Sequence, residues 1–287
     1  MQLPQILVRL INKFKLLPLF NLKTTIVVNN RNVIIPIIAK QGLNNIRLSE
    51  PWMTDVLKKL RPVFNNHFVD VGVNIGQTLV KAYGVFDNVN YIGFEPNPVC
   101  YNYSKKLIEL NNFSNCSIVP VGISGKDEVV QLLFFHNDTA DSSATIVKDF
   151  RDESTVIKKE FVPVFHGTAL TQFLPTTIGS ILKIDVEGAE LEVIEGLRTW
   201  INNTRPIILI EVLPVYTIEN KFRLQRQELI CTYLKQMNFI ITRIMKNDNK
   251  VSLFELDTFD INQEIENSDY IFIPAERTEE IMSLFNN

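Results

Sequence analysis

The chain has 287 residues, of which 46% are apolar and 21% are charged, a composition that excludes a disordered or collagen-like protein. Its 29 Lys and Arg residues and 32 Asp and Glu residues give a net charge of −3, so there is no basic excess for sequence-independent binding of nucleic acid. The three cysteines are odd in number and lack the spacing of metal ligands, which predicts reduced thiols and a cytoplasmic location. No apolar run in the sequence reaches the roughly 18 residues of a membrane span.

The first 49 residues are predicted to form an extension made of a helix and a β-hairpin. Residues 1–20 are rich in apolar side chains and carry Arg9, Lys13 and Lys15 without any acidic residue. This pattern fits either a helix docked on the body of the protein or an amphipathic helix in peripheral contact with an anionic membrane. Residues 24–40 form two β-rich runs around a polar Asn-Asn-Arg-Asn sequence, which is typical of a hairpin.

Residues 50–287 are predicted to form one domain in which strands and helices alternate. Strands are expected at residues 67–72, 91–96, 116–124, 180–188, 206–212, 238–245 and 268–276, with helices at 50–62, 76–86, 98–112 and 188–203 and another ending at 236. Apolar strands that alternate with helices indicate a mostly parallel sheet covered by helices on both faces. The last two strands, joined by a loop, are expected to add an antiparallel edge to this sheet.

An insertion at about residues 126–168 interrupts the alternation. Its segments 128–136 and 160–166 are β-rich and enclose a polar loop. We expect an inserted β-hairpin that stands over the carboxyl edge of the sheet, which is the edge where open α/β sheets bind their ligands.

The end of the first sheet strand is suited to bind a cofactor. The strand ends in Asp70 and Gly72, and the next helix begins at Gly76. Glycine lets a ligand approach both the backbone and the free N–H groups of the helix N-terminus. Glu95 ends the second strand, 19 residues after Gly76, where an acid is placed to accept both hydroxyls of a ribose. The combination predicts an adenosine-containing cofactor.

The spacing of this turn favours S-adenosylmethionine over NAD. Dinucleotide sites usually show G-x-G-x-x-G, whereas this turn reads D-x-G-x-x-x-G with Asp70 first. A carboxylate at this point repels a pyrophosphate and attracts the ammonium group of S-adenosylmethionine. The alternatives are an NAD-dependent oxidoreductase, a non-catalytic cofactor-binding module and a plain strand–helix turn.

Four segments resemble the FkbM-type methyltransferases: DVGVNIG, FEPNPVCYNYSKKL, LKIDVEGAELEVIEGL and PIILIEV. The resemblance covers roughly residues 50–240 and departs from the family at Val73, where a small alanine is most common. It implies an α/β fold of the class I methyltransferase type, which is Rossmann-like, with S-adenosylmethionine as cofactor. It also implies O-methylation of a hydroxyl group on a sugar, a glycan or a small natural product.

The resemblance further implies which residues contact the cofactor. The turn would hold the methionine part, the end of the second strand would bind the ribose, and the third strand would edge the adenine. These residues are Asp70, Gly72, Asn74 and Gly76 in the turn, Glu95, Pro96 and Asn97 at the ribose, and Val121 and Gly122 at the adenine.

The segment from Lys183 to Glu190 is the best candidate for the chemistry. Lys183 and Asp185 alternate with apolar residues on a strand expected to be buried, where charged groups are rarely unpaired. A lysine–carboxylate arrangement at the cofactor edge orients an acceptor hydroxyl or tunes a base. Lys183, Asp185 and Glu187 are therefore the predicted catalytic residues, with Asp185 or Glu187 as the base. Glu190 is explained by the favourable placement of an acid in the first turn of a helix.

Five residues are predicted to bind the acceptor. Glu211 ends the fifth strand at the ligand-binding edge. His136 and His166 end the inserted strands and are expected to face each other across the site, while Ser142 and Ser143 lie in the inserted loop. A divalent cation on Asp185 and Glu211 is an alternative activator, but no clear ligand cluster is present and we assign no metal.

Together these patterns predict an S-adenosylmethionine-dependent O-methyltransferase. Its partner is expected to be a small-molecule or glycan acceptor and not a nucleic acid, because the chain has no basic excess.

Overall fold

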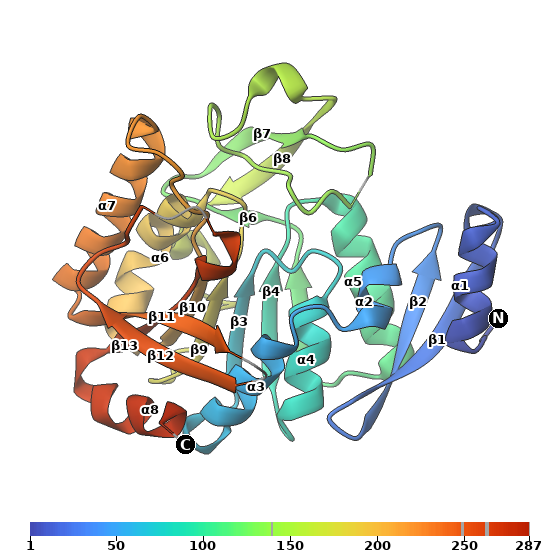
Figure 1. Ribbon diagram of the computed structural model, residues 1–287, viewed down its shortest axis with the longest axis horizontal. Helices are drawn as coiled ribbons and strands as arrows, with labels where there is room; N and C mark the ends of the chain where they lie inside the picture. Colours follow the sequence, from blue (N-terminus) through green and yellow to red (C-terminus); the bar gives the residue numbers. More distant parts are fainter. Residues whose placement is uncertain (139, 248–249, 262–263, 287) are drawn as a thin grey trace.

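The computed structural model describes residues 1–138, 140–247, 250–261 and 264–286. Its central element is an eight-stranded sheet in the order β12-β11-β13-β10-β9-β3-β4-β5, shown in Figure 1. The strands are β3 (His67–Val71), β4 (Asn90–Phe94), β5 (Cys116–Val119), β9 (Ile181–Ile184), β10 (Ile207–Glu211), β11 (Phe239–Asn247), β12 (Lys250–Leu256) and β13 (Asp269–Pro274). The five adjacent strands β10, β9, β3, β4 and β5 are parallel to one another. This confirms the predicted mostly parallel, Rossmann-like sheet.

Helices cover both faces of this sheet. They are α2 (Leu43–Arg47), α3 (Pro51–Leu60), α4 (Gln77–Val85), α5 (Pro98–Asn111), α6 (Glu190–Thr204), α7 (Lys221–Gln236) and α8 (Thr278–Phe285). Alternate strand residues point to opposite faces, so that Phe68 and Ile181 join the hydrophobic cluster of α3, α4 and α8. Their neighbours Val69 and Leu182 join the cluster of α6 and α7 on the other face.

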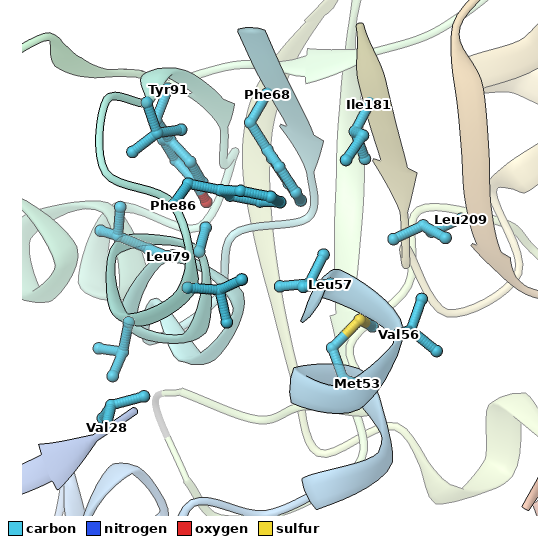
Figure 2. Close-up of a cluster of buried hydrophobic side chains, with 14 of the residues drawn as sticks. Val28, Met53, Val56, Leu57, Phe68, Leu79, Phe86, Tyr91, Ile181 and Leu209 are labelled. Carbon is cyan, nitrogen blue, oxygen red and sulfur yellow. The ribbon is translucent and has the colours of Figure 1, made fainter. Parts of the chain in front are cut away.

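The first of these clusters also ties the β1–β2 hairpin to the sheet. Strands β1 (Asn21–Val28) and β2 (Arg31–Ile38) pair around Asn29 and Asn30, whose positive φ angles of 45° and 66° suit a two-residue hairpin turn. Figure 2 shows Val28 of β1 beside the α4 region and the core residues of α3, β3 and β9. The expected hairpin is confirmed, whereas a domain boundary after residue 49 stays a prediction.

Two strand predictions were wrong. The segment 116–124 is not one strand, because it divides into β5 in the main sheet and β6 (Gly122–Ile123) in a second sheet. Pro120, which lies between them, has no N–H group for a sheet hydrogen bond. The loop expected between residues 247 and 268 contains strand β12. Its side chains are mostly exposed, so it lacks the apolar pattern of a buried strand.

The antiparallel side of the sheet is present, but its edge differs from the expected one. Strand β13 runs antiparallel between β10 and β11, and β12 forms the edge by pairing antiparallel with β11. Residues 248–249 and 262–263 of the expected loop lie outside the described residues.

The predicted insertion forms a second sheet of three strands in the order β6-β8-β7. Strands β7 (Glu128–Phe134) and β8 (Lys158–Phe165) are antiparallel, and β8 also pairs parallel with β6. Figure 1 shows this sheet above the carboxyl ends of β3 and β4, as the sequence predicts. Residue 139 of its polar loop lies outside the described residues.

The chain begins with helix α1 (Gln5–Lys13), which packs on β1, and with the short 3-10 helix η1 (Leu17–Leu19). Within the described ranges, we find no helix whose length and apolar character would allow it to span a bilayer.

Candidate active site

A cavity of about 510 Å³ lies at the carboxyl edge of the main sheet. It is placed where the strand order reverses between β3 and β9, and this reversal is the usual ligand site of an open α/β sheet. Its walls come from the ends of β3, β4, β9 and β10, from the insertion and from the segment 44–50.

The glycine turn after β3 forms one wall of the cavity. Gly72 has a φ of +91°, and a Cβ atom at this position would lie 1.9 Å from the backbone oxygen of Asp185. Only glycine therefore allows the turn to pass this close to the end of β9. Gly76 begins α4 and packs against Leu107 and Ser104 outside the lining residues, so its role is to shape the turn.

Glu95 is the buried acid of the site, with 6% of its surface exposed. One carboxylate oxygen accepts a hydrogen bond of 2.7 Å from the Asn74 N–H, and the other accepts one of 2.8 Å from the Asn97 N–H. Burial raises the pKa of Glu95 to about 7, although both N–H groups oppose this shift. Because a carboxylate keeps free lone pairs beside two such bonds, Glu95 fits the hydroxyls of a ribose.

Asp70 is not among the residues that line the cavity, and its predicted contact with the cofactor stays a prediction. Its side chain is fully buried, accepts a hydrogen bond from the Tyr91 hydroxyl and lies 3.7 Å from the Lys183 ammonium. Burial raises the pKa of Asp70 to about 6, and Lys183 opposes the shift. The sequence led us to expect the ammonium group of the cofactor beside Asp70. The cation found there is the protein's own Lys183.

Lys183 connects Asp70 to the cavity. Its Nζ atom donates a hydrogen bond of 2.8 Å to Asp185, which lines the cavity wall. Burial alone would raise the pKa of Asp185, but the charge of Lys183 outweighs it and the pKa is lowered. The same pairing with Asp185 and Asp70 overcomes the burial of Lys183 and raises its pKa. Both groups are therefore charged at neutral pH.

Glu211 lies next to Asp185 and shares a hydrogen bond with it. Burial and the charges of Asp185 and Asp269 raise the pKa of Glu211 to about 10. Glu211 therefore keeps its proton at neutral pH and donates it toward the ionised Asp185.

Glu187 stands on the same wall in the left-handed conformation, with a φ of +54°. Its side chain accepts a hydrogen bond of 2.6 Å from Arg151, which the sequence analysis missed. Phe150 packs against Gly188 and so brings the neighbouring Arg151 to this position. Burial and then the charge of Asp185 raise the pKa of Glu187 to about 7 in spite of Arg151.

The cavity brings together most of the predicted site residues. Those that line it are Gly72, Asn74, Glu95, Pro96, Asn97, Gly122, Ser142, Lys183, Asp185, Glu187 and Glu211. As far as the chain is described, the lining does not include Val121, whose side chain packs in the cluster of α6 and α7. Ser143 also lies outside the lining, and its hydroxyl donates a hydrogen bond of 2.6 Å to Asp141.

The two histidines do not face each other across the site, so this prediction was wrong. The His136 side chain is 71% exposed and its Nδ1 lies 3.1 Å from Asp141, outside the described cavity wall. His166 begins the 3-10 helix η4 (Gly167–Leu170), where its Nδ1 accepts a hydrogen bond from the Thr168 N–H. Both imidazole rings form hydrogen bonds with residues of their own turns and do not line the described cavity.

The segment 44–50 is a part of the site that the sequence did not reveal. Arg47 and Glu50 line the cavity, and Glu50 pairs at 2.9 Å with Lys81, a buried residue of α4. The one signal in the sequence was that Lys81 stands directly between the apolar residues Val80 and Ala82 of the predicted helix. Among the described residues, no group of three or more His, Cys, Asp or Glu is suited to hold a metal ion.

Comparison with known proteins agrees with this geometry. The family model described as the methyltransferase FkbM domain matches residues 70–272. The chain belongs to the FkbM methyltransferase family. FkbM methyltransferases use S-adenosylmethionine, and the open Gly72 turn and the buried Glu95 fit that cofactor.

Two curated proteins are similar to this chain. The methyltransferase sdnD of Sordaria araneosa is 29% identical over 46% of this chain and 61% of its own length. Methyltransferase 1 of Beauveria bassiana is 26% identical over 46% of this chain and 59% of its own length. The chain thus spans about three fifths of each relative that it matches.

Solved structures with a similar fold include the FkbM methyltransferase from Methylobacillus flagellatus KT. It is 14% identical with a TM-score of 0.44, and the match covers 75% of this chain and 47% of that one. The precorrin-6y C5,15-methyltransferase from Geobacter metallireducens GS-15 is 11% identical with a TM-score of 0.38, and the match covers 77% and 86% of the two chains.

We expect Glu95→Gln to weaken binding of S-adenosylmethionine at least tenfold, because hydrogen bonds to a charged group contribute about 1.5–3 kcal/mol each. Isothermal titration calorimetry measures this change. Glu190→Gln is the matched control, since Glu190 is also buried but accepts a hydrogen bond from the Gly188 N–H outside the cavity lining. An unchanged affinity in a folded Glu95→Gln variant would contradict the ribose assignment.

The pH dependence of stability tests the protonated state of Glu211. Its pKa of about 10 lies above the ordinary value of 4.5, so the folded state holds an extra proton between these values. The free energy of unfolding therefore falls as the pH rises, by up to about 1.4 kcal/mol per pH unit. Glu211→Gln removes this loss. Urea denaturation should therefore show that the free energy of unfolding of the variant rises relative to that of the wild type from about pH 6 to 9. Glu255→Gln, exposed on β12, is the control; parallel curves for Glu211→Gln and wild type would refute the assignment.

Proposed function

We propose that this enzyme transfers a methyl group from S-adenosylmethionine to a hydroxyl group of a small molecule or glycan, with Glu187 as the base. The observation that carries the proposal is a cavity with two acids on its walls: Glu95, which is suited to the hydroxyls of a ribose, and Glu187, whose pKa is about 7. When bound, the cofactor supplies an electrophilic methyl group on a sulfonium. The protein must position the acceptor oxygen and remove its proton.

Glu187 is a better base than Asp185 at neutral pH. A base works best when its pKa lies near the operating pH, and the pKa of Glu187 is about 7. Lys183 lowers the pKa of Asp185, which makes this carboxylate a weak proton acceptor. We therefore assign proton removal to Glu187 and orientation of the acceptor hydroxyl to the Lys183–Asp185 pair.

The remaining walls support an acceptor that carries several hydroxyl groups. The insertion contributes Asp141 and Ser142, and the segment 44–50 contributes Asn44 and Ser49. These side chains supply both donors and acceptors of hydrogen bonds, which suit a sugar or a hydroxylated natural product. Leu132 and Ile146 add an apolar area suited to the hydrocarbon part of such a molecule.

A cytoplasmic location and an acceptor other than nucleic acid complete the proposal. All three cysteines are unpaired, as in proteins of a reducing compartment. The net charge of −3 offers no general attraction to a phosphate backbone.

The experiment is methyl transfer from ¹³C-methyl S-adenosylmethionine to a panel of sugars, sugar nucleotides and hydroxylated natural products. The ¹³C chemical shift of the product distinguishes an O-methyl group from an N-methyl or C-methyl group. Transfer to oxygen is the expected result. Labelling of nitrogen or carbon alone would contradict the proposal.

Once an acceptor is found, Glu187→Gln should lower the rate of methyl transfer by about 10²–10⁴, the usual effect of losing an acid–base group. In the wild type the rate should rise as the pH increases through about 7, because only ionised Glu187 accepts the proton. Affinity for S-adenosylmethionine should stay within a few-fold, and Glu190→Gln should change neither quantity. If the Glu187→Gln variant transferred the methyl group at the wild-type rate, Glu187 would not be the base.

A further inference from the structure

Residues 1–20, which contain α1 and η1, expose several large apolar side chains, which we name the α1 apolar face. The exposed fractions are 70% for Ile6, 69% for Phe14 and 71% for Leu19. Its members are Met1, Ile6, Leu7, Leu10, Phe14, Leu16, Leu19 and Phe20. A grouped set of exposed apolar side chains marks an interaction surface, whereas single ones need no explanation.

The helix is fixed to the protein by its opposite side. Val8 is fully buried, and the Gln5 side chain donates a hydrogen bond of 3.2 Å to the backbone oxygen of Thr25 in β1. Ile6 and Leu10 are four residues apart, as are Leu10 and Phe14, so they form one stripe along the helix. Figure 1 shows α1 on the outer side of the β1–β2 hairpin, away from the main sheet. The apolar stripe therefore points to the surroundings of the molecule.

Basic side chains border this stripe. Arg9 and Lys13 are exposed and four residues apart on the helix, and exposed Lys15 lies two residues beyond its end. None of the three forms an ion pair with a residue that the structure describes. Their charges are therefore available to a partner.

Basic and acidic residues are distributed unevenly along the chain. The first 49 residues contain seven Lys and Arg residues and no Asp or Glu, while the other 238 residues contain 22 basic and 32 acidic residues. The excess of positive charge is thus confined to the part of the chain that carries the α1 apolar face.

We propose that the α1 apolar face docks on the surface of a membrane that contains anionic lipids. A helix with apolar side chains on one arc and Lys or Arg beside them lies in the interface, with the apolar groups among the acyl chains and the cations at the headgroups. Each basic residue near an anionic surface strengthens this binding. The inference is independent of the proposed acceptor and of the assigned base.

A second copy of the chain fits this surface less well. A two-fold symmetric contact would bring Arg9, Lys13 and Lys15 of both copies to the same interface, where like charges repel. An anionic bilayer instead complements both the apolar stripe and its basic border.

The test is co-sedimentation of the full chain with vesicles of phosphatidylcholine alone or mixed with phosphatidylglycerol. We expect at least tenfold tighter binding to the anionic vesicles and a loss of binding as NaCl is increased. The double variant Ile6→Ser/Phe14→Ser and the triple variant Arg9→Gln/Lys13→Gln/Lys15→Gln should each weaken this binding at least tenfold.

The matched control is Val129→Ser/Phe161→Ser, which removes two exposed apolar side chains from the inserted sheet and should leave vesicle binding within two-fold. All variants should bind S-adenosylmethionine as the wild type does, since the altered residues lie outside the cavity lining; this measurement confirms that they fold. Equal binding to neutral and anionic vesicles, no binding, or an equal loss in the control would overturn the proposal. A dimer in solution that Ile6→Ser/Phe14→Ser abolishes, without vesicle binding, would overturn it in favour of a second copy.

Discussion

The protonation states of the site depend on one buried cation, Lys183. A charged group inside a protein is stable only when opposite charges and hydrogen bonds compensate for its lost hydration. Lys183 has Asp70 on one side at 3.7 Å and Asp185 on the other at 2.8 Å. The register of the sheet dictates the first contact, because Lys183 of β9 is the direct partner of Asp70 in β3.

The ionised Asp185 of this pair also affects the protonation of the neighbouring acids Glu211 and Glu187. Glu211 keeps its proton because it is buried and because Asp185, held ionised by Lys183, lies beside it. The charge of Asp185 also adds to burial in raising the pKa of Glu187 to about 7. Three neighbouring carboxyl groups thus differ in proton affinity, and this difference distinguishes the proposed base, Glu187, from the groups proposed to orient the acceptor.

Local sequence was sufficient to predict the parallel part of the sheet and the parts of the site at strand ends. Gly72, Glu95 and Asp185 each follow directly after an apolar strand in the chain. A short motif therefore shows both the residue and its place at the strand end. Contacts between distant segments were not predictable in this way. The partner of Asp70 is 113 positions away at Lys183, and Arg151 reaches Glu187 only because Phe150 packs on Gly188. The histidines were misplaced for the same reason, since a strand end does not show which way the following turn folds.

The family match and the cavity walls divide the site into two parts. The matched region begins at Asp70 and contains the glycine turn, Glu95 and the acids of β9 and β10. Asn44, Arg47 and Glu50 also line the cavity but precede that region. We propose that the glycine turn and Glu95 of the matched region hold the cofactor, and that the segment 44–50 outside it contacts the acceptor together with the insertion.

A crystal structure with S-adenosylhomocysteine tests the central claim most directly, namely that one cavity joins a cofactor held by Glu95 to a base at Glu187. The account predicts ribose hydroxyls that donate hydrogen bonds to Glu95, the amino acid part beside the Gly72 turn, and open space between the sulfur and Glu187. A ligand bound with its ribose away from Glu95, or a sulfur separated from Glu187 by protein, would contradict it.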